Sequence, residues 1–333
     1  MHGVGQPPVM GINTEYFAYL KEAHIPYSRL HDVGGWFGGN LFVDIPNIFR
    51  DFEKDETNPE NYDFTFTDIL LKGLVDNGCE PYFRLGVTIE NFHKHKYYRI
   101  VPPKDNLKWA KICEHVIRHY NEGWADGFHY GIKYWEIWNE PDNSYLIEEN
   151  EMWKGTDEQY FELYRVTSKY LKSCFGDKIK IGGYASCGFY AITNNKTAGQ
   201  VAMGTKDGLN AWEARISGFY DFFVKFVKMV KEENLPLDFF SYHSYAGVAE
   251  TVTMHRFVEA YFEKAGLSNV EFHLNEWNTN VQKENRGKSI ASANALAMML
   301  AMQNTRMQVM CYYDARIHTS VYGGLFHPMT YEP

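Results

Sequence analysis

The chain has 333 residues and a formal net charge of −9 at pH 7, from 33 Lys and Arg against 42 Asp and Glu. The length suits one large domain or two medium ones, and the acidic balance without a basic run argues against nucleic acid as a partner. No apolar run approaches the roughly 18 residues of a membrane-spanning helix, so we expect no membrane segment. Tyr, Phe and Trp make up 17% of the chain, which suits either a large core or flat ligands such as sugar rings.

Short β-rich runs alternate with helical patterns from the first residues to the last. The predicted strands are 2–5, 27–31, 82–87, 132–139, 178–183, 237–245, 270–277 and 308–315. The predicted helices include 13–23, 106–120, 157–174, 214–233, 254–265 and 289–304. This alternation predicts parallel strands joined by helical crossovers. We therefore expect one (β/α)₈ barrel over residues 1–333, with a doubly wound sheet as the alternative.

The five cysteines are scattered and form no CxxC motif, which predicts reduced, mostly buried thiols instead of disulfides or a zinc site. The N-terminal residues MHGVGQPPVM lack a signal-peptide pattern. The location is cytoplasmic if this start is complete, and secreted or periplasmic if a leader has been removed. The cysteines are Cys79, Cys113, Cys174, Cys187 and Cys311.

Polar residues gather where the predicted strands end. In a (β/α)₈ barrel the C-terminal ends of the strands carry the chemistry, because they meet at one mouth. Glu140 and Glu276 end strands that are not adjacent, so two carboxylates face this mouth. The other strand-end residues are His31, Asp32, Arg84, Asn139, His243, Tyr245, Tyr313 and Asp314.

Strand periodicity predicts how deep each acidic residue lies. A period of two places Tyr134, Glu136, Trp138 and Glu140 on one face, with Glu140 outermost and Glu136 a hydrogen-bonded carboxylate inside the barrel. In the seventh strand the same count places Phe272, Leu274 and Glu276 together.

Two carboxyl groups across a cavity are what glycoside hydrolysis requires. One protonates the leaving oxygen, while the other attacks the sugar or activates a water molecule. Paired acids also bind metals or basic ligands, but no spacing such as HExxH is present, so we expect no metal and no cofactor.

At these residues the sequence resembles glycoside hydrolase family 39, the β-xylosidase and α-L-iduronidase family of retaining (β/α)₈ enzymes. Residues 135–142 (WEIWNEPD) are similar to the family's acid/base motif, and residues 272–279 (FHLNEWNT) to its nucleophile motif. Four further segments resemble the family in the same order along the chain: 27–31, 101–109, 152–172 and 238–245.

The resemblance implies a retaining double displacement, with Glu140 as general acid/base and Glu276 as nucleophile. Asn139 would bind the sugar 2-hydroxyl, His31 and His243 would contact the sugar, and Tyr245 would orient Glu276. Three aromatic residues join the expected substrate site. Trp277 is expected as wall or platform, Tyr313 lies at the end of the eighth strand, and Trp153 is an exposed leaving-group candidate unless it packs on the following helix.

Two arginines depart from the family pattern. Arg84 stands where the family commonly has glutamate, and Arg316 follows the eighth strand. Either would suit a substrate carboxylate, because arginine binds carboxylates well. For Arg84 we favour a pair with an interior acid such as Glu136. The long segment 187–215 after the fifth strand is expected to shape the entrance and the leaving-group specificity.

The expected function is exo-acting retaining hydrolysis of β-xylosides or related pentosides, hexosides or uronides. An endo-acting polysaccharide hydrolase and a non-catalytic carbohydrate-binding barrel are the alternatives, and oligo- or polysaccharide is the expected partner in each case. The last helix and the family's accessory β-sandwich are missing from the pattern. We therefore expect a bare apolar flank, so that either residues are missing from this chain or a partner, such as a second copy, covers it.

Overall fold

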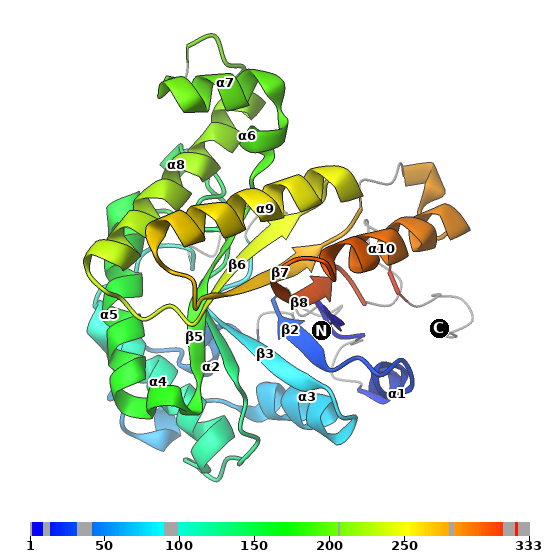
Figure 1. Ribbon diagram of the computed structural model, residues 1–333. Helices are drawn as coiled ribbons and strands as arrows, with labels where there is room; N and C mark the ends of the chain where they lie inside the picture. The colour runs from blue at the N-terminus through cyan, green and yellow to red at the C-terminus, as the bar shows by residue number, and fades with distance from the viewer. Residues whose placement is uncertain are drawn as a thin grey trace.

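Eight parallel strands close into a barrel in sequence order, which confirms the (β/α)₈ fold (Figure 1). In this computed structural model the described residues are 2–8, 14–31, 42–89, 99–205, 207–279, 283–315 and 324–325. The strands are β1 (His2–Val4), β2 (Tyr27–Leu30), β3 (Glu80–Leu85), β4 (Tyr134–Ile137), β5 (Lys180–Ser186), β6 (Phe239–Ser244), β7 (Glu271–Trp277) and β8 (Met307–Tyr312).

Helices follow the first seven strands and cover the outside of the barrel (Figure 1). The longer ones are α3 (Thr65–Asp76), α4 (Asn106–Glu122), α5 (Asp157–Phe175), α8 (Ala211–Glu232), α9 (Val248–Ala265) and α10 (Ser289–Met302). The short ones are α1 (Ala18–Glu22), α2 (Ile45–Ile48), α6 (Tyr190–Thr193) and α7 (Asn195–Met203). The helix α3 was not among those predicted.

Local sequence signals set where the helices begin and end. Thr156 caps α5 through a capping box with Gln159, and the Asp105 carboxylate accepts the first backbone N–H groups of α4. Gly123 ends α4 at a φ of 75°, a conformation that suits glycine. These caps hold the crossover helices in register with the strands that carry the site.

The barrel interior is layered from aromatic to polar. The lower layer is a cluster separate from the main core, made of Tyr27, Tyr82, Tyr134, Phe239, Val309 and Cys311. Toward the C-terminal ends of the strands, Arg29 and Glu136 are both fully buried and hydrogen-bonded to each other. The main hydrophobic core lies between the strands and the helices. Polar groups therefore become more frequent along the barrel axis toward the mouth.

The predicted face of the seventh strand was wrong. Phe272 contacts Phe262 of α9 outside the barrel, whereas His273 stacks on Phe239 inside it. The register with β6 shifts after Leu274, which pairs with Tyr242, because the next pair is His243 with Glu276. Asn275 is thus an extra residue, and this bulge returns Glu276 to the interior.

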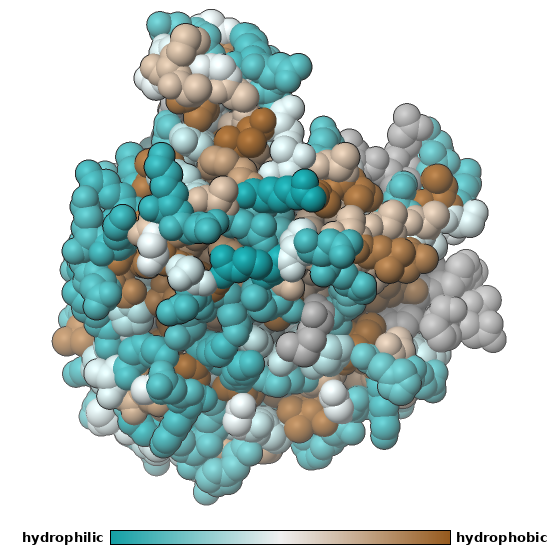
Figure 2. Space-filling model, viewed as in Figure 1, coloured by the Kyte–Doolittle hydropathy of each residue, from teal (hydrophilic) through white to brown (hydrophobic). Residues whose placement is uncertain are grey.

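The outer surface of α10 is apolar and partly exposed. On α10 only Met298 and Met302 are buried, and Figure 2 shows hydrophobic surface over this helix. Ile290, Leu296 and Leu300 are about half exposed there. No helix follows β8 in the part of the chain that the structure describes.

The five cysteines are free thiols, and all but Cys174 are buried. Among the described helices, none has the length and apolar character to cross a membrane.

Candidate active site

The end of β4 turns sharply to present Glu140. Trp138 and Glu140 both have positive φ, 71° and 44°, which L-residues adopt at a cost of order 1 kcal/mol or more. The turn breaks the predicted alternation. The Trp138 indole packs outside the barrel beside Trp109 and Trp153, with its Nε1 donating to the Met152 carbonyl. The Glu140 backbone N–H donates to Ala185 of β5, which holds its carboxyl at the mouth.

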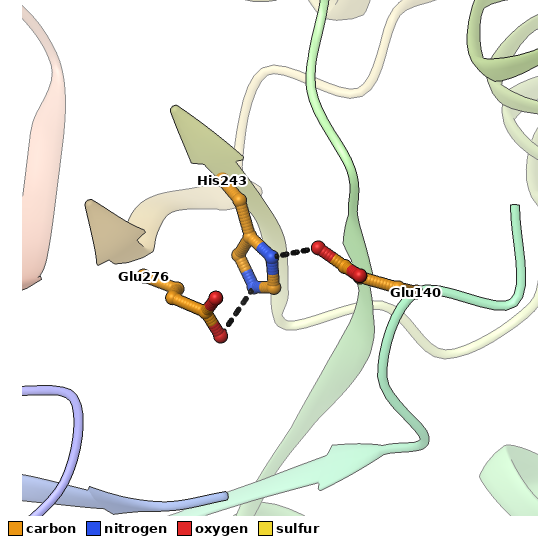
Figure 3. Close-up of side chains that lie close together, drawn as sticks. All are labelled: Glu140, His243 and Glu276. Atoms are coloured by element: carbon orange, nitrogen blue, oxygen red, sulfur yellow. Dashed lines mark hydrogen bonds and ion pairs between the residues drawn. The ribbon is translucent and has the colours of Figure 1, made fainter. Parts of the chain in front are cut away.

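His243 of β6 lies between the two glutamates (Figure 3). Its Nδ1 lies 2.7 Å from Glu140 Oε1, and its Nε2 lies 3.8 Å from Glu276 Oε2. One carboxylate oxygen of Glu140, one of Glu276 and one ring nitrogen of His243 all lie within 4.8 Å of one another. Retaining glycosidases hold their two carboxyl groups about 5–5.5 Å apart, and inverting enzymes about 6.5–9.5 Å. The spacing of Glu140 and Glu276 therefore fits the retaining geometry.

Glu140 and His243 shift each other's pKa values. Burial alone would raise the pKa of Glu140, but the hydrogen bond and charge of His243, with the Asn143 amide, lower it below its ordinary value. Burial opposes the charging of His243, yet the nearby Glu276 and Glu140 carboxylates raise its pKa. Together the two residues hold one proton on a short contact beside the mouth.

Glu276 is held by donors on both oxygens. The Tyr245 hydroxyl donates to Oε1 at 2.5 Å, as predicted, and Arg29 Nη1 donates to Oε2 at 3.1 Å. Arg29 Nη2 also donates to Asn139 Oδ1 at 2.5 Å, which leaves the Asn139 amide nitrogen as the donor for a ligand. These contacts fix the orientation of the Glu276 carboxylate, as a nucleophile requires.

The outer side of Glu140 contacts a second group of residues. Asn143 Nδ2 donates to Glu140 Oε2 at 2.9 Å. Arg215 of α8 fixes Asn143, because its Nε donates to the Asn143 carbonyl at 2.7 Å and its Nη2 to the Asn143 amide oxygen at 3.0 Å. The Cys187 thiol lies 3.8 Å from Asn143 Nδ2. Burial and the charge of Glu140 raise the pKa of Asp142 to about 7, although the Ser186 hydroxyl donates to it at 2.7 Å.

Sequence reasoning gave no role to Arg29, Asn143 or Arg215. Arg29 belongs to segment 27–31, one of those that resemble the family, but the sequence did not indicate which side chains it contacts. Asn143 comes directly after the acid/base motif, three residues beyond Glu140. Arg215 lies 72 residues further along the chain, and no local pattern connects it with Asn143.

The structure brings most of the predicted residues to the mouth. His31 and Asn139 are buried at the ends of β2 and β4, and the Tyr313 ring lies 6.0 Å from the Tyr245 ring. Trp277 is 1% exposed and packs on Tyr312, so it belongs to the wall. Arg316 and Asp32 lie outside the described residues.

Two expectations need correction. Trp153 is 1% exposed, with its ring against Trp138 and Tyr160 of α5, so it packs on the following helix and is no exposed platform. Arg84 does pair with an interior acid, but the acid is Asp44, at 2.7 Å from Arg84 Nη2. Glu136 instead pairs with Arg29, because Arg29 lies in the same polar layer of the barrel.

Within the described residues, Glu140, His243 and Glu276 form the group that could hold a metal ion. Arg29 donates to Glu276 in this group, so a dication would lie against a guanidinium. The same groups suit acid/base and nucleophilic chemistry without that conflict.

An eight-stranded parallel barrel with two carboxylates at its mouth is the arrangement that retaining glycoside hydrolases use. The chain belongs to glycosyl hydrolases family 39, whose family model matches residues 12–312.

The chain is similar to named glycosidases over most of its length. It is 25% identical to a β-xylosidase of Geobacillus stearothermophilus over 284 residues, which cover 81% of this chain and 46% of that protein. A glucosidase structure from Croceicoccus marinus matches with a TM-score of 0.74 at 20% identity, over 98% of this chain and 64% of the other. A family 39 β-xylosidase structure from Caulobacter crescentus matches with a TM-score of 0.62 at 19% identity, over 98% and 67%. The chain thus spans about half the length of its curated relative.

Proposed function

We propose that this chain hydrolyses β-xylosides by a retaining double displacement, releasing sugar from chain ends. The observation that carries the proposal is the spacing of Glu140 and Glu276, whose carboxylate oxygens approach within 4.8 Å around His243. The choice of β-xylosides rests on the similarity to proteins named β-xylosidase.

In the first step a Glu276 oxygen attacks the anomeric carbon while the bond to the leaving oxygen breaks. Glu140 passes to the leaving oxygen the proton that it shares with His243 through the 2.7 Å contact, and so enters the second step as a carboxylate. In the second step Glu140 removes a proton from water, and the water oxygen displaces Glu276 from the sugar. The product is a sugar with its original anomeric configuration, and both carboxyls return to their starting states.

One observation favours a uronide as the second candidate substrate. Arg84 is fully buried at the end of β3, and its Nε and Nη1 have no hydrogen-bond partner among the described residues. Buried unpaired donors are costly, and a substrate oxygen near Arg84 would satisfy them. Glucuronides therefore belong in the substrate set beside xylosides.

The first experiment labels the nucleophile. The protein is incubated with 2-deoxy-2-fluoro glycosides of xylose, glucose and glucuronic acid that carry dinitrophenyl leaving groups, and any adduct is located by intact-mass and peptide mass spectrometry. We expect a xylosyl adduct on Glu276. If only the glucuronic acid reagent forms an adduct, the substrates are uronides and not xylosides. A folded protein that forms no adduct would favour the non-catalytic barrel. Xylose and xylopentaose as the only first products from xylohexaose would support exo action.

Two substitutions separate the roles of the carboxyls. Glu276→Ala should abolish turnover of aryl xylosides, and azide should restore it by taking the nucleophile's place. Glu140→Ala should slow turnover of 4-nitrophenyl xyloside by roughly 10²–10⁴-fold, with less effect on the glycosylation step for dinitrophenyl xyloside. Glu148→Ala, an exposed glutamate in the same loop, is the matched control. Full activity in both catalytic variants would refute the assignment.

A further inference from the structure

The segment between β5 and the body of α8 projects from the barrel (Figure 1). It contains α6, α7 and the first turn of α8, which begins after an Asn210 capping box. Two contacts tie this first turn to the catalytic glutamates, one to each.

The first contact runs to the acid/base. Arg215, in the first turns of α8, holds Asn143, and Asn143 donates to Glu140 Oε2 at 2.9 Å. The first turn of α8 therefore lies on the outer side of Glu140, opposite the oxygen that His243 contacts. In the proposed reaction Glu140 protonates the leaving oxygen, so this is the side where the leaving group must lie.

The second contact runs to the nucleophile through two tyrosines. The Trp212 ring lies 6.0 Å from the Tyr190 ring, and the Tyr190 hydroxyl accepts the backbone N–H of Tyr245 at 2.9 Å. Tyr245 in turn donates to Glu276. Trp212 precedes Arg215 by three residues, a spacing that puts both on one face of the helix. The Trp212 indole therefore lies at the entrance to the site formed by Glu140 and Glu276.

Exposure distinguishes Trp212 from the other tryptophans near the site. It is 51% exposed, whereas Trp138, Trp153 and Trp277 are at most 2% exposed. On the same side, Tyr145 is 47% exposed and lies against α8, where a Cβ on Gly218 would meet the Tyr145 Cβ at 3.1 Å. Two half-exposed aromatic rings therefore flank the Arg215–Asn143 contact.

We propose that Trp212, backed by Tyr190, is the platform of a leaving-group subsite that stacks a sugar ring. A half-exposed indole presents a broad apolar face, which matches the apolar face of a pyranose ring. Occupation would bury the indole while the sugar hydroxyls stay in water. The proposal deepens the proposed function and rests on it for the position of the leaving group.

The test compares a substrate that has a leaving-group sugar with one that does not. The value of kcat/KM is measured for xylotriose and for β-D-xylopyranosyl fluoride, whose leaving group is a single atom. We expect Trp212→Ala to lower the xylotriose-to-fluoride ratio by roughly fivefold to tenfold, and Trp212→Phe to retain most of it. Met203→Ala is the matched control, since Met203 is 69% exposed on the same projection. Its ratio should equal that of the unsubstituted protein.

Two outcomes would overturn the subsite. One is a ratio in Trp212→Ala equal to that in Met203→Ala, as a surface for a protein partner would give. The other is an equal loss on both substrates, as general structural damage would give.

A binding measurement separates this proposal from the catalytic one. Calorimetry measures the affinity of xylotriose for Glu140→Gln and for Glu140→Gln/Trp212→Ala. If the unsubstituted protein turns over neither substrate but xylotriose binding weakens without Trp212, the proposed hydrolysis is wrong and the platform is supported. If binding is the same in both variants, or absent from both, the platform is overturned.

Discussion

At the scale of single residues, the two carboxyls that we propose as catalytic differ in the groups that hydrogen-bond to them. Glu276 accepts from a phenol and a guanidinium, which stay donors throughout the reaction. Glu140 accepts from the His243 imidazole and the Asn143 amide, and the imidazole can gain or lose a proton. This difference fits the proposed roles, in which Glu276 attacks the sugar and Glu140 exchanges a proton twice.

Asn143→Ala tests the amide contact. Burial raises the pKa of Glu140, and the His243 and Asn143 contacts lower it, so loss of the amide should raise it. Glu140 must be ionised to act as a base in the second step. Dinitrophenyl xyloside has a fast first step, so its kcat reports the second step. The acidic limb of its kcat–pH profile should therefore move to higher pH. The control is Ser144→Ala, whose hydroxyl accepts from the Leu146 backbone. An unshifted limb in Asn143→Ala would show that the amide does not influence Glu140.

At the scale of elements, Glu271 joins the first residues of three strands. It begins β7, accepts from the Tyr134 hydroxyl of β4 at 3.0 Å, and forms an ion pair with Lys180 of β5. Its burial opposes ionisation, but the contacts with His273 and Lys180 lower its pKa to about 2. Charge at this position thus stabilises the end of the barrel away from the site.

Glu271→Gln should lower the free energy of unfolding at pH 7 by about 1–3 kcal/mol. The pKa in the folded protein lies below that of the unfolded chain, so this stabilisation is fully present above pH ~4.5 and is lost as the pH falls toward 2. Urea unfolding at pH 7 and at pH 3 should show the difference between the two proteins shrinking with acidification. Glu263→Gln, on the exposed side of α9, is the control and should stay within about 0.5 kcal/mol. A difference that is equal at both pH values would contradict the role of the charge.

At the scale of the whole molecule, one polar layer crosses the barrel. Glu136 of β4 accepts from Arg29 of β2 at 2.8 Å and from Ser241 of β6 at 2.6 Å, and Asn275 of β7 also donates to it. All four residues are fully buried. The layer therefore connects β4 with three strands that are not its neighbours in the sheet, and it supports the site directly above it.

Removing Glu136 should destabilise the entire barrel, because it leaves the Arg29 charge buried and only partly compensated. We expect Glu136→Ala to lower the free energy of unfolding by about 3–5 kcal/mol, and the double change Arg29→Met/Glu136→Leu to cost less than the sum of the single changes. Urea unfolding followed by tryptophan fluorescence and by circular dichroism should shift together. A loss under 1 kcal/mol, or a shift in one signal alone, would show that the layer does not couple the strands.

The sequence by itself determined the strand order, the barrel and the two glutamates at strand ends, because a β/α rhythm and a strand-end carboxylate are local properties. Only the tertiary structure decided the rest. The bulge at Asn275 depends on pairing with β6, and the partner of Glu136 depends on which arginine shares its layer. Trp153, in the loop before α5, and Trp212, in the first turn of α8, are the same residue type near the site, yet one is buried and the other is half exposed. Burial is set by what distant parts of the chain place against a side chain, and no short stretch of sequence contains that information.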